Sequence, residues 1–151
     1  MEAIFSIWKR NREIYLTYLN NYSVEQLNKI PEGFSNNLIW NIAHVIVCQQ
    51  VLVYKFSGLD TYVSDELIKT YGPGTRPVKE VSADEVEILK SLLLTLIDKT
   101  ISDYKDEKFI TYKKLETSMG FHINSIKGAL EYNNYHEGLH LGYIMNIKRF
   151  V

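Results

Sequence analysis

Hydrophobic residues recur every three or four positions along several stretches of the chain, which is the spacing of one face of an α-helix. Four of these stretches are long, and they cover residues 2–20, about 36–57, about 83–105 and about 122–149. A short helix is also expected near residues 23–30. No stretch shows the strict alternation that is typical of a half-buried strand. The pattern therefore predicts an all-α fold with four long helices.

Local signals fix several helix ends. Ser23 with Gln26 and Ser82 with Glu85 both have the spacing of a capping box, which closes the amino end of a helix. Ser35 is expected to cap the second long helix. These signals predict the start of the short helix and of the second and third long helices.

The connection between the second and third long helices is long and irregular. Residues 59–81 contain one stretch that suits a short helix, 64–71, and a Gly- and Pro-rich stretch, 72–77, that does not. A connection of this length suits a crossover between parallel helices or a flap over a site. Residues 106–121 are expected to form turns or extended chain.

The length and composition favour one domain, a four-helix bundle spanning residues 1–151. The net charge is −1, from 17 basic and 18 acidic residues without a cluster of either sign, so no nucleic-acid partner is expected. The single cysteine, Cys48, excludes an internal disulfide and fits a reducing compartment. No secretion signal is visible, and polar residues interrupt every apolar tract before the ~20 residues that span a bilayer. These features predict a cytoplasmic protein that does not enter a membrane.

The last long helix carries a pair of histidines with the spacing of metal ligands. His136 and His140 are four residues apart, so both imidazoles leave the same face of the helix and can reach one metal ion. A third ligand is expected from His44, which lies on the apolar stripe of the second long helix. An unpaired polar ring buried there would cost about 1–3 kcal/mol. The sequence therefore predicts a divalent metal ion, zinc or nickel, bound by these three histidines. His122, far along the helix from the pair, is left out.

Other interpretations of these residues stay open. The pair could be surface histidines, or core histidines that bind backbone carbonyl groups. Cys48, one turn after His44, could be a fourth ligand, although a small buried core residue is the favoured interpretation. Tyr143, one turn after His140, could place its hydroxyl near the metal.

Residues 136–140 also spell H-E-x-x-H, the zinc-binding helix of one class of metalloprotease. Only 11 residues follow His140, and none is an acidic residue or histidine that could supply the third ligand of such an enzyme. A protease is therefore disfavoured. Glu137 could act as a base on metal-bound water, but a surface or ligand-orienting carboxylate is favoured. Gly138 and Gly142 predict a close approach of a neighbouring helix or ligand.

The order and spacing of these motifs resemble the DinB-like superfamily, also called the DinB/YfiT-like metalloenzymes. The matching positions are Ser23–Asn28, Pro31, Gly33, Asn37, Trp40, His44, Asn133, His136–His140 and Gly142. The resemblance implies an up-up-down-down four-helix bundle that forms homodimers. It also implies nickel or zinc held by His44, His136 and His140. Characterised relatives use the metal to activate low-molecular-weight thiols, as in bacillithiol transferases and mycothiol-dependent maleylpyruvate isomerase.

Two classes of function follow. The favoured one is a metal-dependent enzyme that transfers a thiol to a small electrophile, with hydrolysis as a second reaction type, since three neutral histidines leave coordination positions open. The alternative is a non-catalytic metal- or small-molecule-binding bundle, in which the histidines tie the second and fourth long helices together. In both, the partner is a small molecule.

Overall fold

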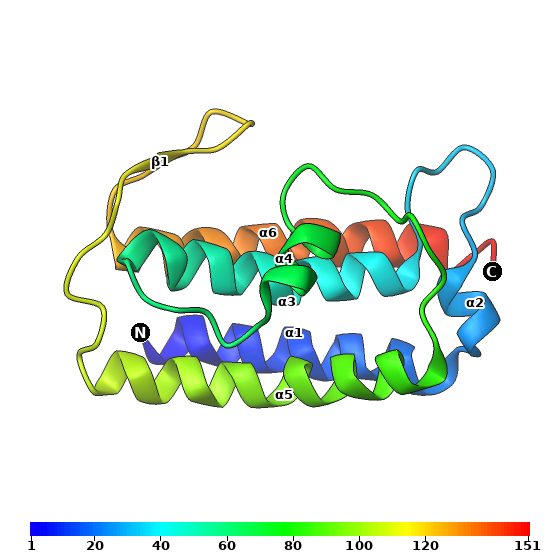
Figure 1. The fold of residues 1–151 in the computed structure, drawn as a ribbon, viewed down its shortest axis with the longest axis horizontal. Coiled ribbons are helices and arrows are strands. Elements are labelled where there is room, and N and C mark those ends of the chain that lie inside the picture. The colour runs from blue at the N-terminus through cyan, green and yellow to red at the C-terminus, as the bar shows by residue number, and fades with distance from the viewer.

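The computed structural model describes residues 1–151 and consists mainly of helices. Four long helices lie side by side along the long axis of the molecule (Figure 1): α1 (Glu2–Asn21), α3 (Leu38–Val53), α5 (Ala83–Lys105) and α6 (Ile126–Ile147). The shorter elements are α2 (Val24–Asn28), the 3-10 helix η1 (Lys55–Ser57), α4 (Asp65–Tyr71), and the strands β1 (Leu115–Glu116) and β2 (His122–Ile123). The predicted helical fold is confirmed, with one small two-stranded sheet in addition.

The directions of the long helices differ from the expected order. α1 and α6 are parallel, because Asn134 donates a hydrogen bond to the carbonyl oxygen of Ile4 near their starts, whereas Lys148 lies over the Tyr18 ring near their ends. α3 and α5 run in the opposite direction (Figure 1). The order along the chain is therefore up-down-down-up, and the up-up-down-down order is wrong.

The connections explain this order. Residues 22–37, which include α2, turn the chain back at one end of the bundle, so α3 is antiparallel to α1. Residues 54–82 then return along the whole bundle through η1 and α4, so that α3 and α5 start at the same end (Figure 1). The predicted crossover between parallel helices is confirmed, but it joins α3 to α5 within a different overall order.

α3 is the central helix of the bundle. It begins after Asn37, whose side-chain oxygen accepts a hydrogen bond from the backbone N–H of Trp40 across 2.9 Å. The expected cap at Ser35 is wrong, and the helix ends at Val53 because residues 55–57 tighten into a 3-10 turn before Gly58, which has a φ of 75°. Every residue from Leu38 to Gln50 is buried, since α6, α5, α4 and α2 all pack on α3.

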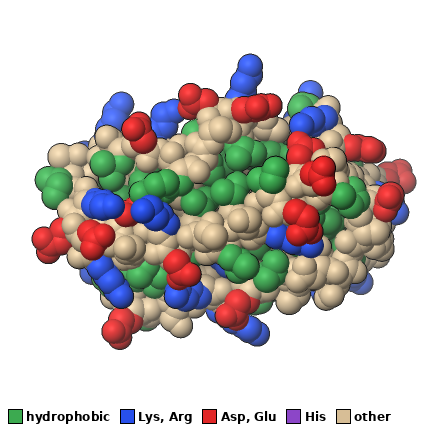
Figure 2. All heavy atoms as spheres, turned by 60° about the horizontal axis from the view of Figure 1, so that its bottom comes forward, with side chains coloured by type: hydrophobic (Ala, Val, Ile, Leu, Met, Phe, Trp, Pro, Cys, Tyr) green, Lys and Arg blue, Asp and Glu red, His purple; other side chains and the backbone are tan.

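The burial of α3 also explains its composition. The segment Leu38–Ser57 is long and apolar enough to cross a membrane, contrary to the expectation that no tract reaches this length, but 89% of an 18-residue stretch within it is buried inside the bundle. A core helix of a soluble protein has the same composition. On the face drawn in Figure 2, acidic and basic side chains are interspersed around apolar patches. No single-sign surface of the kind that binds nucleic acid is visible on that face.

The last long helix starts later than its pattern predicts. Residues 122 and 123 form β2, which pairs with β1 in an antiparallel hairpin with Leu115 opposite Ile123. Ser125 then caps α6 by accepting a hydrogen bond from the Gly128 N–H across 3.1 Å. Both predicted capping boxes, at Ser23 and Ser82, are confirmed.

Candidate metal centre

The three histidines singled out in the sequence lie against one another between α3 and α6. The ring centres of His44 and His140 are 4.6 Å apart, those of His136 and His140 are 4.6 Å apart, and those of His44 and His136 are 5.3 Å apart. With metal–nitrogen bonds of ~2.0–2.1 Å, two imidazoles on one tetrahedral ion have ring centres about 5 Å apart. The ring spacing therefore fits ligands that share one ion.

His44 is oriented by the crossover connection. Its Nδ1 atom lies 2.6 Å from the carbonyl oxygen of Tyr71, the last residue of α4. Because a carbonyl oxygen only accepts, Nδ1 carries the proton and Nε2 keeps its lone pair. The Trp40 ring stacks on the imidazole at 4.5 Å, and only 6% of His44 is exposed. Burial lowers the pKa of His44, so the ring is neutral, the form that binds metal.

His140 is held in the same way by α3. Its Nδ1 atom lies 2.8 Å from the side-chain oxygen of Asn41. The Asn41 amide group donates to the carbonyl oxygen of Asn37 across 2.7 Å and to the Asn36 side chain across 2.9 Å, which directs its oxygen toward His140. The second nitrogen of the His140 ring is thereby left as an acceptor, and such hydrogen bonds to ligating histidines set the tautomer and the ring orientation.

His136 makes no hydrogen bond through either ring nitrogen, although it lies mostly inside the protein. Burial, followed by the charges of His44 and Arg12, lowers its pKa to about 4. Burial, followed by the charges of His136 and His44, lowers the pKa of His140 to about 2. All three rings are therefore neutral near pH 7, which suits them as ligands.

Cys48 lies with His44 and His136. The donor atoms of His44, Cys48 and His136 all lie within 4.8 Å of one another. The Cys48 sulfur is 3.3 Å from Nε2 and 3.6 Å from Nδ1 of His44, so it lies against the imidazole ring. The residue is buried, as the favoured core interpretation expects, and burial raises the pKa of its thiol to about 12.

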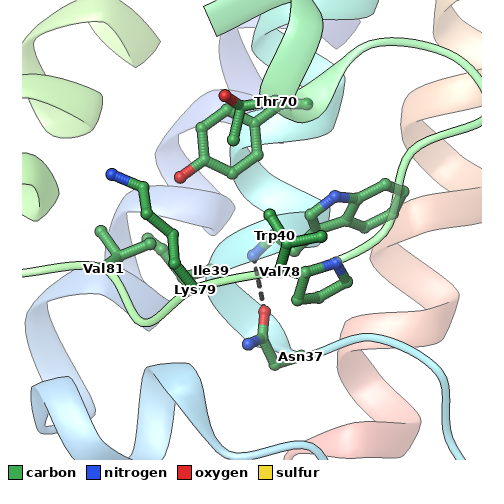
Figure 3. A pocket seen from close by; sticks show the side chains of 9 residues that line it. Asn37, Ile39, Trp40, Thr70, Val78, Lys79 and Val81 are labelled. Carbon is green, nitrogen blue, oxygen red and sulfur yellow. Dashed lines mark hydrogen bonds between the residues drawn. The ribbon is translucent and has the colours of Figure 1, made fainter.

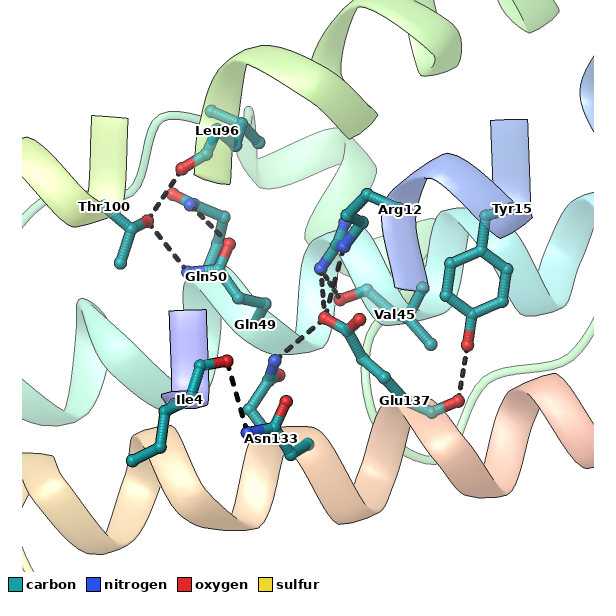
Figure 4. A network of polar contacts seen from close by, with 11 residues as sticks. Ile4, Arg12, Tyr15, Val45, Gln49, Gln50, Leu96, Thr100, Asn133 and Glu137 are labelled. Carbon is teal, nitrogen blue, oxygen red and sulfur yellow. Dashed lines mark hydrogen bonds and ion pairs between the residues drawn. The ribbon is translucent and has the colours of Figure 1, made fainter. Parts of the chain in front are cut away.

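Glu137 points toward Arg12 of α1 (Figure 4). Its Oε1 atom accepts hydrogen bonds from Nη2 of Arg12 at 2.5 Å, Nε of Arg12 at 3.2 Å and the Asn133 amide at 2.8 Å. The Tyr15 hydroxyl donates to the Glu137 carbonyl oxygen. Glu137 is 0% exposed, so the expectation of a surface carboxylate is wrong. Its ion pair with Arg12 argues against a role as a base on metal-bound water.

Sequence reasoning missed Arg12. Its position was a signal, because it falls between Trp8 and Tyr15 on the apolar stripe of α1, where a charge needs a partner. The only acidic residue between Tyr132 and Ile147 is Glu137, so it was a candidate partner for Arg12. The H-E-x-x-H motif instead suggested that Glu137 acts near the metal.

Three other residues lie at the edge of the site or away from it. Tyr143 is 48% exposed, with its ring centre 6.3 Å from that of His140. His122 is exposed on β2, outside the cluster. At Gly138 and Gly142 an added Cβ would meet no atom within 4 Å, and both glycines are exposed. The predicted close approach of a neighbouring helix is therefore wrong within one chain, and the approach of a ligand stays a prediction.

A pocket is lined in part by Trp40 and Tyr71, the two residues that contact His44 (Figure 3). It is lined by Asn37, Ile39, Trp40, Thr70, Tyr71, Pro77, Val78, Lys79 and Val81. The end of the crossover connection therefore covers α3 next to the residues that contact His44. Whether this connection acts as a flap stays a prediction.

A comparison of the sequence with protein families gives the family of the chain. The family model of the DinB superfamily matches residues 7–144, which include every residue of the cluster. The chain therefore belongs to the DinB superfamily. A comparison with curated proteins gave no match.

Proposed function

We propose that this protein binds a divalent metal ion through His44, His136 and His140 and uses it to transfer a low-molecular-weight thiol to a small electrophile. The observation that supports this most is the arrangement of the imidazoles. Three neutral rings from two helices meet, and hydrogen bonds to Tyr71 and Asn41 leave one nitrogen of His44 and one of His140 as acceptors. The family membership is compatible with metal binding.

The chemistry of the donor set fits zinc or nickel, since imidazole suits both ions. A bound divalent ion would lower the pKa of a thiol and so provide a nucleophile near neutral pH. The residues of this chain would bind and orient the ion, and Trp40, stacked on His44, would keep bulk water away from one side. Tyr143, at the exposed edge beside His140, would present its hydroxyl to a substrate.

We also propose a cytoplasmic homodimer. Between Tyr132 and Ile147, α6 has one charged residue, Glu137, and that residue is buried. The exposed side of this stretch is therefore uncharged and carries Tyr135, Leu139 and Tyr143. An apolar helix face without charges suits contact with the same face of a second copy. A molar mass of one chain in light scattering at micromolar concentration would contradict the dimer.

The test of the enzymatic proposal is turnover with a panel of thiols and electrophiles. Protein loaded with zinc or nickel is expected to form the thioether product, and the metal-free protein and the His136→Ala variant are not. His122→Ala is the matched control, since it removes the one histidine outside the cluster. Full turnover by His136→Ala would reject the proposal.

One observation favours a second candidate, a non-catalytic metal-binding bundle. The donor atoms of His44, Cys48 and His136 lie within 4.8 Å of one another, and a site closed by protein ligands alone is typical of structural metal. In that case the loaded protein has no turnover with any thiol or ester in the panel, whereas metal removal lowers its melting temperature. Turnover that depends on the metal decides for the enzyme.

A further inference from the structure

The second half of the crossover connection is anchored at two points. At the first, the carbonyl oxygen of Tyr71 binds Nδ1 of His44 across 2.6 Å. At the second, the backbone N–H and carbonyl oxygen of Val81 make two hydrogen bonds, each of 2.8 Å, with the side chain of Asn28. Residues 73–80, which we call the lid, lie between these anchors.

The lid itself is weakly bound to the bundle. Its backbone donates one hydrogen bond, from Thr75 to the carbonyl oxygen of Gly72 just before it. Its one polar contact with a long helix is the ion pair between Lys79 and Glu85 of α5. These side chains are 55% and 37% exposed, and such surface pairs add little to stability. The lid can therefore leave the bundle without breaking a ladder of hydrogen bonds.

Trp40 lies against the lid and has a polar group without a partner. Pro77 and Val78 of the lid line the same pocket as the Trp40 side chain (Figure 3). Only 7% of Trp40 is exposed, and its indole N–H pairs with no polar group of the protein. A buried donor in this state is unfavourable. The closed lid thus leaves an unsatisfied donor next to His44, on which the Trp40 ring stacks.

The pocket between Trp40 and the closed lid is too small for a substrate. Its free volume of about 10 Å³ holds one water molecule at most. We propose that the lid opens and uncovers a subsite for the small-molecule substrate, in which the Trp40 N–H binds an acceptor such as a carbonyl oxygen. Because the subsite lies beside His44, its role in substrate binding rests on the proposed function, whereas the opening of the lid does not.

Hydrogen exchange of the two indole N–H groups, followed by NMR in heavy water, tests the opening. Trp8 is the control within the same molecule, because its N–H is also buried without a partner. Trp8 packs in a cluster with Phe5 and Leu130 that contains no residue of the lid. The Trp40 N–H is expected to exchange at least about 10-fold faster, since it needs only a local opening. Equal rates for both groups would overturn the lid.

The Gly74→Ala variant makes the test specific to the lid. Gly74 has a φ of 81°, which an alanine adopts at a cost, so opening and the exchange of Trp40 should become about 5–30-fold more frequent. Gly33→Ala is the matched control, since Gly33 has a φ of 82° and the same open space for a Cβ. Exchange of Trp40 that is as slow in Gly74→Ala as in the wild type would overturn the proposal. The comparison with Trp8 in the wild type holds even if a variant does not fold.

Kinetics of the metal-loaded protein test the role of the Trp40 N–H. Chloroacetamide has a carbonyl oxygen and allyl chloride has no such acceptor. Both react by the same step, in which the thiol sulfur bonds to the CH₂ carbon, chloride leaves with the electron pair and the thiol proton passes to solvent. In Trp40→Phe, which keeps an aromatic ring on His44, the KM for chloroacetamide is expected to rise about 2–10-fold relative to that for allyl chloride.

The outcomes separate the subsite from the proposed function. An equal change of KM for both electrophiles in Trp40→Phe would overturn the subsite, although the metal-dependent reaction stands. If the wild-type protein turns over neither electrophile with any thiol, the proposed function and the subsite fail together. The exchange rates of Trp40 and Trp8 still decide whether the lid opens, because they require neither metal nor turnover.

Discussion

The Nδ1 atom of His44 donates a hydrogen bond to the carbonyl oxygen of Tyr71 across 2.6 Å. Tyr71 is the last residue of α4, so the crossover connection orients a candidate ligand that belongs to the central helix of the bundle. The long connection is therefore part of the site as well as a link between α3 and α5. Its geometry near residue 71 should affect metal binding.

The Gly72→Ala variant tests this relationship. A Cβ at Gly72 would collide with the backbone carbonyl of Ile68, so the end of α4 has to shift and move the Tyr71 carbonyl away from His44. We expect the metal affinity to fall by about 10-fold or more, the effect of losing a group that orients a ligand. Gly128→Ala is the control, since a Cβ there makes only ordinary contacts. Equal affinities of the two variants, measured by competition with a chromophoric chelator, would contradict the relationship.

Asn41 should act on His140 in the same way. Its side-chain oxygen holds the Nδ1 proton of His140 at 2.8 Å. In Asn41→Leu this acceptor is lost, and the metal affinity is expected to fall about 10–100-fold. Asn41→Asp keeps the oxygen acceptor for His140 but loses the amide donor to Asn36 and Asn37, so its loss should be smaller than that of Asn41→Leu. Isothermal titration of the metal-free variants measures the difference, and similar losses in both would show that Asn41 supports only the packing.

The ion pair between Arg12 and Glu137 is predicted to affect stability rather than metal chemistry. Both side chains are at most 2% exposed, and removing one partner leaves an uncompensated buried charge. Arg12→Met is expected to lower the free energy of unfolding by about 3–5 kcal/mol. Adding Glu137→Gln should recover part of this loss, because the unpaired charge is gone. Urea unfolding of the two single variants and the double variant measures the coupling, and a single-variant loss below about 1 kcal/mol would argue against it.

The depressed pKa values of the histidines predict how the metal-free protein responds to pH. Unfolded histidine has a pKa near ~6.5, whereas burial lowers that of His136 to about 4 in the folded protein. Between these values the unfolded chain binds more protons than the folded one, so the free energy of unfolding decreases as the pH falls. Urea unfolding at pH 7.5 and pH 5 should show this decrease. It should be smaller in His136→Asn and unchanged in His122→Ala, and a metal-free protein that is equally stable at both pH values would contradict the assignment.

Much of the fold could be predicted from the sequence because its determinants are local. The capping boxes at Ser23 and Ser82 and the periodicity of residues 83–105 depend on neighbours within one turn of helix. The predicted start of α3 was wrong because Asn37, two residues after the expected cap Ser35, accepts the hydrogen bond from the Trp40 N–H. The helix directions depend on which ends of the bundle the connections join, and hydrophobic periodicity does not contain that information.

The site could be predicted in part for a similar reason. The four-residue step from His136 to His140 fixes a shared face, and the apolar stripe points His44 inward, so their convergence followed from helix geometry. The role of Glu137 could not be predicted in this way, because it depends on Arg12, which lies 125 residues away in the chain. The hydrogen bond from His44 to Tyr71 was also inaccessible, since it uses a backbone carbonyl group in an irregular connection.

The central claim is that His44, His136 and His140 bind one divalent ion per chain. Elemental analysis of the purified protein, beside His44→Ala and the control His122→Ala, tests it most directly. The wild-type protein and His122→Ala are expected to contain about one zinc or nickel ion per chain, and His44→Ala is expected to contain almost none, because loss of a direct ligand exceeds the 10–100-fold effect of an orienting group. Equal metal contents in wild type and a folded His44→Ala variant would contradict the claim.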